Sequence, residues 1–142
     1  MKHATQIVAY MTPFPFSIEI DAPLGEARSF MRLKQIRHLP VTERGRLVGI
    51  VSDRDIKLIL GPDFAYPEES TLTVRDACVC DAYVVEADTA LDEVAGTMAR
   101  RHLGSALVIK TGKLVGIFTT TDACRALESL LKSPPAGSPE AA

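Results

Sequence analysis

Apolar and polar positions follow the same order in both halves of the chain, and that order predicts the secondary structure. Short runs rich in β-branched and aromatic residues, FSIEID and YVVEAD, are typical of strands. Apolar positions at helical spacing begin near Leu24 after the first run and near Leu91 after the second. Two strand-like runs then surround Gly45 or Gly112, which favours a tight hairpin, and a second apolar helical run follows. We therefore predict the order β-α-β-β-α twice.

The two halves align without a gap when the sequence is shifted by 67 positions, since 116 − 49 = 67. Glycines, acidic residues and apolar residues stay in phase; the matched pairs include Glu19 with Glu86, Asp21 with Asp88, Met31 with Met98, and Gly49 with Gly116. One unit of this size buries little apolar surface alone, so we expect the two copies to pack sheet against sheet. The predicted fold class is α/β (α+β), with two β-α-β-β-α units packed as a pseudo-twofold pair and small sheets flanked by helices.

Composition narrows the class of protein. The 142 residues are 46% hydrophobic and 24% charged, with a net charge of −2, as in ordinary globular proteins. Without a large basic patch, nucleic acid is not an expected partner. The chain has no apolar run of about 18 residues, so no membrane partner is expected, and its start does not resemble a signal peptide. We expect a cytoplasmic protein.

The cysteines leave two interpretations open. Cys78, Cys80 and Cys124 are an odd number and do not form a disulfide framework. Cys-x-Cys with one further cysteine could ligate zinc, but the usual second pair of ligands is absent from the sequence. Reduced, half-buried thiols are the simpler interpretation, and we expect no metal site.

A hydroxyl residue, two variable positions and an aspartate follow an apolar strand twice, as Ser52 to Asp55 and as Thr119 to Asp122. This spacing resembles the capping box, so both are expected to start a helix. The same residues suit a ligand, because a carboxylate can accept both hydroxyl hydrogens of a ribose diol, and a helix N-terminus favours phosphate. Capping and binding are compatible, and the pattern alone does not choose between them.

Three motifs together resemble a known family. Met11-Thr12-Pro13, Ile36-Arg37-His38-Leu39-Pro40-Val41 and Gly49-Ile-Val-Ser-Asp-Arg-Asp55 are similar to those of a tandem CBS-domain pair, or Bateman module. We expect a stand-alone pair. The resemblance is looser in the second half, where Cys78-Val79-Cys80 and Ser105-Ala106-Leu107-Val108 replace the first two motifs. It implies a first CBS domain at 5–60, a linker at 61–72 and a second CBS domain at 73–132. The Pro- and Ser-rich tail, 133–142, is expected to be disordered.

The resemblance also implies a function. Such pairs bind adenine-containing ligands (AMP, ADP, ATP or S-adenosylmethionine) in clefts between the motifs, and two pairs usually form a dimer. We therefore expect a homodimer that acts on an unknown partner protein in trans. Carried over, the hydroxyls of Ser52 and Thr119 lie near phosphate, and Asp55 and Asp122 accept from ribose. No cofactor beyond such a regulatory ligand is expected.

Further candidate ligand-binding residues follow from position in the motifs. Arg54 could bind phosphate bidentately, whereas its counterpart Thr121 could not, so the first motif is the better phosphate site. Arg54 could equally be a solvated residue at a helix start, and His38 could serve hairpin packing. Phe16 and Tyr83 could stack on adenine or belong to the core. The remaining candidates are Arg37, Pro40 and Ser105.

Two hypotheses remain, because the sequence contains no nucleophile elbow, glycine-rich phosphate loop or metal pair that would indicate an enzyme. The first is a stand-alone regulatory module that binds an adenine-containing ligand. The second is a structural or interaction dimer with empty or vestigial nucleotide clefts.

Overall fold

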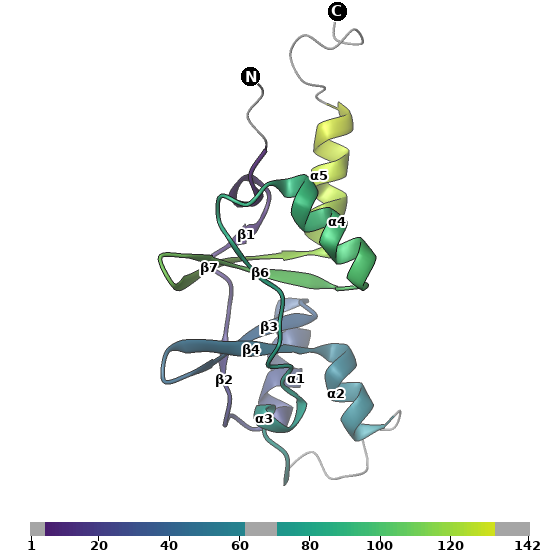
Figure 1. Cartoon of the computed structure of the whole chain (residues 1–142). Helices are drawn as coiled ribbons and strands as arrows, with labels where there is room; N and C mark the ends of the chain where they lie inside the picture. Colours follow the sequence, from purple (N-terminus) through teal and green to yellow (C-terminus); the bar gives the residue numbers. More distant parts are fainter. Residues whose placement is uncertain (1–4, 62–70, 133–142) are drawn as a thin grey trace, which may run out of the picture. The chain divides into compact units, whose positions relative to one another are not determined.

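The computed structural model describes residues 5–61 and 71–132. Most of the predicted linker, at 62–70, and the predicted tail, 133–142, lie outside the described residues. The chain divides into two units, which we treat separately (Figure 1). The first unit is Pro15–Ala82, and the second unit combines the residues up to Phe14 with those from Tyr83 onward.

The first unit contains a three-stranded sheet of order β2-β3-β4, in which β2 is parallel and β4 antiparallel to β3. Its elements are β2 (Ile18–Glu19), α1 (Leu24–Lys34), β3 (His38–Glu43), β4 (Arg46–Ser52), α2 (Asp53–Leu60) and α3 (Val74–Ala77). Its core joins one face of the helices to the inner face of the sheet; the fully buried members are Leu24, Ala27, Leu39, Val41, Val51, Ile56 and Val74.

The second unit repeats this plan with one more short strand, giving the sheet order β1-β7-β6-β5. Its elements are η1 (Ile7–Ala9), β1 (Thr12–Pro13), β5 (Val84–Glu86), α4 (Leu91–Arg101), β6 (Ser105–Lys110), β7 (Lys113–Thr119) and α5 (Thr120–Lys132). Its core includes Ile7, Val94, Met98, Ala106, Val108 and Phe118. None of the helices in the described ranges is long and apolar enough to cross a membrane.

The predicted β-α-β-β-α order is confirmed in both units, and so are the two hairpins. Gly45 and Gly112 have φ values of +81° and +76°, which glycine adopts without a steric penalty. Even the irregularity in strand pairing recurs, between Val41 and Thr42 in one unit and between Val108 and Ile109 in the other. The repeat in the sequence is therefore a repeat in the backbone.

The units nevertheless exchange short segments relative to the sequence repeat. Residues 6–13 come from the first half of the chain but pair with the second unit, where Thr12 lies opposite Ile117 of β7. The corresponding segment of the second half pairs with the first unit, where Val79 lies opposite Ile50 of β4. These two registers are equivalent, because Thr12 and Ile50 both move by 67 positions onto their counterparts. Each unit is thus completed by a segment from the other half of the chain.

Candidate functional site

The first candidate turn lies between β4 and α2 and forms a full capping box. The Asp55 backbone N–H donates to the Ser52 hydroxyl at 3.1 Å, and Asp55 Oδ2 accepts from the Ser52 backbone N–H at 2.8 Å. The Ser52 hydroxyl donates to the same Oδ2 atom at 2.7 Å. The predicted cap is confirmed, and it uses only one of the two carboxylate oxygens of Asp55.

The second candidate turn, between β7 and α5, has the same internal geometry. Asp122 Oδ2 accepts from the Thr119 backbone N–H at 2.9 Å and from its hydroxyl at 3.2 Å, and the Asp122 N–H donates back at 3.4 Å. Asp122 is only 4% exposed, and it is the buried charged residue among those that the structure describes. Helix capping is therefore common to both copies of the motif.

The two turns differ at the other carboxylate oxygen. Asp122 Oδ1 accepts a hydrogen bond from the hydroxyl of Thr12 at 2.8 Å, and the guanidinium of Arg125 lies 3.7 Å away. For Asp55 Oδ1, no donor is found within residues 5–61 and 71–132, and the residue is half-buried rather than buried. An acceptor that faces no protein donor can accept from a ligand.

His38 lies beside the first turn. It is the first residue of β3 and is opposite Ser52, the last residue of β4. Burial lowers the pKa of His38 below its ordinary value, the Asp55 carboxylate opposes that change, and Arg37 adds to it. The imidazole is therefore neutral at pH 7 and can offer a ligand one donor and one acceptor.

The other candidates of the first unit have different environments. Arg37 is exposed, and its carbonyl accepts from the Asp53 N–H at 3.0 Å. Pro40 is buried in β3 opposite Ile50, so it shapes the strand. Arg54 is exposed in the first turn of α2 and forms no ion pair with the described residues. Both guanidinium groups are exposed, and that of Arg54 lies in the first turn of the helix that follows Ser52.

The aromatic candidates already have protein partners. The ring of Phe16 contacts Phe30 edge to face at 5.2 Å, and the ammonium of Lys34 lies 5.2 Å from its centre. Tyr83 packs against the core of the second unit, with the Arg101 guanidinium 5.6 Å from its ring centre. Both rings keep an accessible part, since Phe16 is 49% exposed and Tyr83 is half-buried. Stacking on adenine remains a prediction for both.

Ser105 is the counterpart of His38 and lies opposite Thr119, as His38 lies opposite Ser52. The second turn therefore has a hydroxyl where the first has an imidazole.

The sequence places Thr12 and Val79 in equivalent segments but does not make them candidate site residues; the structure brings Thr12 onto Asp122 and pairs Val79 with Ile50 of β4. The signal that could have found them is a glycine within each strand, because such a glycine often marks a close approach by another segment. A Cβ atom on Gly116 would collide with the side chain of Met11, and one on Gly49 would collide with the carbonyl of Val79.

Cys78, Cys80 and Cys124 are free thiols, and in the described ranges none belongs to a group of side chains that could hold a metal ion. Burial and the neighbouring Cys80 raise the pKa of the Cys78 thiol to about 11, so it is protonated at pH 7. In the described ranges, no group of three or more His, Cys, Asp or Glu side chains could hold a metal ion.

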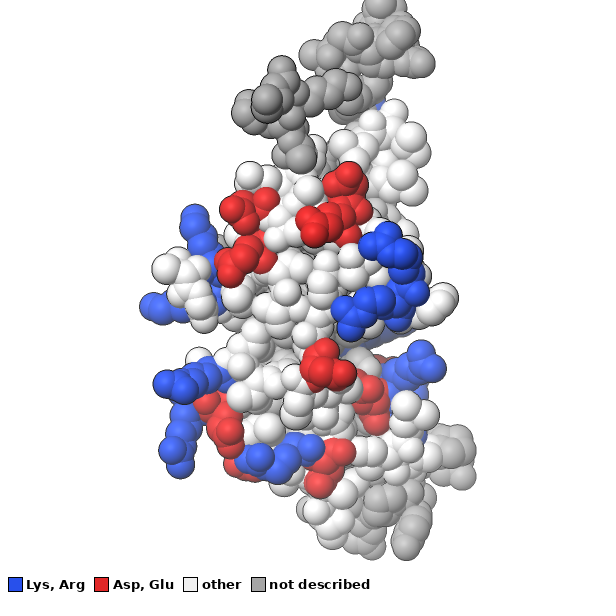
Figure 2. Space-filling view, viewed as in Figure 1, with Lys and Arg blue, Asp and Glu red and all other residues white. Residues whose placement is uncertain are grey.

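Figure 2 shows Lys and Arg interspersed with Asp and Glu on the visible face of each unit, without a broad basic surface.

Comparison with known protein families gives matches in both halves of the chain. The model of the CBS domain matches twice, at residues 5–61 and 74–129. The chain belongs to the CBS-domain family. The two matches of the CBS model correspond to the two copies of the sequence repeat.

Curated relatives of this CBS-domain chain include whole enzymes and smaller proteins. Inosine-5'-monophosphate dehydrogenase of Thermoplasma acidophilum is 28% identical over 75% of this chain, which spans only 20% of that enzyme. Hypoxic response protein 1 of Mycobacterium tuberculosis is 30% identical, with 73% of this chain and 72% of the relative covered. The chain spans between 20% and 31% of the length of the first three relatives.

Solved structures of the same fold include three with bound ligands or metal ions. The CBS domain pair of protein MJ0100, in complex with 5'-methylthioadenosine and S-adenosyl-L-methionine, has a TM-score of 0.78 at 23% identity, covering 89% of this chain and 98% of its own. CBSX2 in complex with AMP has a TM-score of 0.76 at 24% identity, with the same two coverages. Hypoxic Response Protein I with two coordinated zinc ions has a TM-score of 0.71 at 28% identity, with 85% and 98% covered.

Proposed function

We propose that this chain is a regulatory module whose first turn, Ser52 to Asp55, binds an adenine-containing ligand such as AMP, ADP, ATP or S-adenosylmethionine. The module acts in the cytoplasm on a partner protein in trans. The observation that carries the proposal is the Asp55 carboxylate, which has one oxygen in the helix cap and one that faces no described donor. The adenosine ligands of two proteins with the same fold support the ligand class.

The chemistry of the turn assigns each ligand group a partner. Asp55 Oδ1 accepts from the ribose hydroxyls, and the neutral His38 imidazole supplies a hydrogen-bonding group next to it. The N–H groups of Asp53 and Asp55 are already used by the Arg37 carbonyl and the Ser52 hydroxyl. In the first turn of the helix this leaves the Arg54 N–H, which has no intrahelical acceptor, together with the Arg54 guanidinium. These two groups bind phosphate, and the Ser52 hydroxyl serves chiefly the cap.

Calorimetric titration of Asp55→Asn tests the ribose contact. The amide retains one oxygen for the cap but places an NH₂ donor where the ribose hydroxyls need an acceptor. We expect affinity for AMP to fall about 10- to 100-fold, since hydrogen bonds to charged groups contribute roughly 1.5–3 kcal/mol. Asp76→Asn is the matched control, because Asp76 forms the same capping box with Thr73 in α3 but is outside both motifs. If Asp55→Asn binds AMP as the parent does, the turn is only a cap.

A second variant separates phosphate recognition from nucleoside recognition. Arg54→Gln removes the charge but keeps a long polar side chain. We expect it to weaken AMP and ATP about 10-fold while 5'-methylthioadenosine, which has no phosphate, is unaffected. Equal losses for both ligands would show that Arg54 supports the turn rather than phosphate. No binding of any adenine compound at millimolar concentration to the parent chain would refute the sensor function.

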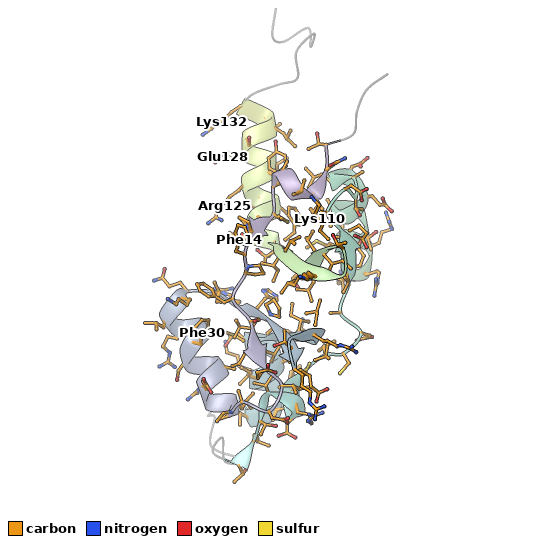
Figure 3. All side chains as sticks on the ribbon, turned by 90° about the vertical axis from the view of Figure 1, so that its left-hand side faces the viewer. Phe14, Phe30, Lys110, Arg125, Glu128 and Lys132 are labelled. Atoms are coloured by element: carbon orange, nitrogen blue, oxygen red, sulfur yellow. The ribbon has the colours of Figure 1, made fainter. Side chains whose placement is uncertain are left out.

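The competing function, a structural or interaction dimer, is favoured by the surface of α5. Leu127, Leu130 and Leu131 lie on one face of this helix and are 59%, 39% and 74% exposed. Figure 3 shows Arg125, Glu128 and Lys132 along the helix, and the last two form an ion pair at 3.2 Å. The helix thus combines a charged side with a largely exposed apolar side.

A cavity of about 390 Å³ continues this apolar side toward α4. It is lined chiefly by Leu91, Ala95, Ala126, Leu127 and Leu130. In the first unit, Leu72 packs against the core at the position that Thr5 occupies here, since 5 + 67 = 72. The shorter polar side chain of Thr5 leaves the cavity open, and we propose that a second copy of the chain covers it.

Sedimentation or light scattering tests this homodimer. Leu130→Asp should yield monomers at micromolar concentration, because a carboxylate would be buried without a partner. Val84→Asp is the control. Val84 has a similar exposed fraction, 41% against 39% for Leu130, but it belongs to the edge strand β5 and not to the apolar side of α5. A monomeric parent chain would refute the dimer and would leave the proposed ligand binding untested by this experiment.

A further inference from the structure

We propose that Thr12 closes the second turn to ligands, so that each chain binds one adenine-containing ligand, at the first turn only. The side chain at this position, Thr12 in the second unit and Val79 in the first, decides which copy of the motif is open. This inference rests on the proposed function of the first turn and adds a residue outside both turns, Ser52 to Asp55 and Thr119 to Asp122, that controls which of them binds.

The hydrogen bonds of Asp122 carry the inference. Its Oδ2 is engaged by Thr119, and its Oδ1 accepts from the Thr12 hydroxyl at 2.8 Å, with Arg125 contributing charge at 3.7 Å. At 4% exposure, this carboxylate has an internal donor for both oxygens and little access from solvent. A ribose diol could bind only by displacing the Thr12 hydroxyl, so it would replace one hydrogen bond to a charged group with another instead of gaining one.

The first unit has the same backbone arrangement without the donor. Val79 lies opposite Ile50 as Thr12 lies opposite Ile117, and the two registers differ by the repeat length of 67. Valine has nearly the shape of threonine but no hydroxyl, so it cannot donate to Asp55. The counterpart of Arg125 is Leu58, which brings no charge. The two equivalent positions therefore present a donor to Asp122 and none to Asp55.

Reciprocal substitutions test the proposal by calorimetry with AMP and with 5'-methylthioadenosine. We expect one site per chain in the parent. Thr12→Val should add a second site, and Thr12→Ser, which keeps the donor, should not. Val79→Thr should weaken the first site about 10-fold or more, because the new hydroxyl occupies Asp55 Oδ1.

The combination Asp55→Asn with Thr12→Val isolates the second turn, and its remaining site should be lost again on adding Asp122→Asn. Two sites in the parent chain would overturn the inference and leave the proposed function intact. So would a Thr12→Val variant that still binds one ligand while Val79→Thr binds normally. Absence of any binding in the parent would instead refute the proposed function, and with it the inference.

Discussion

Gly49 and Gly116 occupy equivalent positions in the two strands β4 and β7, yet alanine should be tolerated differently at each. A Cβ atom on Gly49 would overlap the backbone carbonyl of Val79 and approach Cys78 Sγ to 2.7 Å. On Gly116, all three nearest atoms belong to the side chain of Met11, which has three rotatable bonds and can move aside. Alanine therefore has to displace backbone in one unit and only a flexible side chain in the other.

The backbone displaced by Gly49→Ala carries two hydrogen bonds, from the Ile50 N–H to Val79 at 3.0 Å and from the Val79 N–H to Ile50 at 2.8 Å. Overpacking costs about 1–3 kcal/mol, and strain on both bonds places this variant at the upper end. We expect Gly49→Ala to lower the free energy of unfolding by about 2–3 kcal/mol, and Gly116→Ala by about 1 kcal/mol or less.

Urea unfolding monitored by circular dichroism measures both variants against the same parent. The difference corresponds to a melting temperature lower by roughly 3–8 °C for Gly49→Ala than for Gly116→Ala. The slope of the free energy against urea should stay constant, which shows that only stability has changed. Equal losses, or a larger loss at Gly116, would refute the assignment of a backbone contact at Gly49 and a side-chain contact at Gly116.

Three further outcomes are expected. Gly96→Ala in α4 should raise the free energy of unfolding by about 0.5–1 kcal/mol, measured in urea, because alanine favours the helix and only a mobile arginine side chain is close. At pH 8, iodoacetamide should label the exposed Cys80 well before Cys78, whose pKa is raised to about 11; equal labelling rates by mass spectrometry would contradict this. The pKa of His38, measured by NMR titration, should lie below 6.5, and it should fall further in Asp55→Asn because the Asp55 carboxylate opposes the lowering. Since the unfolded chain binds this proton more readily than the folded chain, His38 lowers the free energy of unfolding as the pH falls below about 6.5.

The secondary structure could be predicted because each element carries its own local signal. Apolar spacing defined the helices that begin at Leu24 and Leu91, and glycine marked the hairpins at Gly45 and Gly112. The exchange of segments could not be predicted, because both halves carry an equivalent segment, and periodicity cannot tell which unit each one joins. The pairing of Thr12 with β7 shows that the first segment joins the second unit, and this pairing is a contact between residues far apart in the sequence.

In the candidate site, too, the local features could be predicted and the long-range contact could not. The capping boxes followed from the spacing of Ser52 and Asp55, which is a local property of the helix start. From the sequence alone, the difference between the turns is the replacement of Arg54 by Thr121, and both of these residues lie within the motif. The larger difference is the hydroxyl of Thr12 on Asp122, which comes from a residue 110 positions away. Such a contact has no signature in the motif itself.

The exchange also determines which pieces of the chain can fold. The fragment 5–61 contains the whole first copy of the repeat but lacks α3, whose Val74 is fully buried and whose Arg75 binds Asp21 and Glu43 at 3.0 and 2.9 Å. The fragment 15–82 contains the complete first unit, including the pairing of Val79 with β4.

We expect dispersed amide signals in the NMR spectrum of 15–82 and an unfolded spectrum for 5–61, although the two fragments are similar in length. A domain of about 60 residues is marginally stable, so the loss of a buried valine, worth about 1.5–3 kcal/mol of burial, is enough to unfold it. If 5–61 folds as well as 15–82, the exchanged segment is a covering rather than part of the unit.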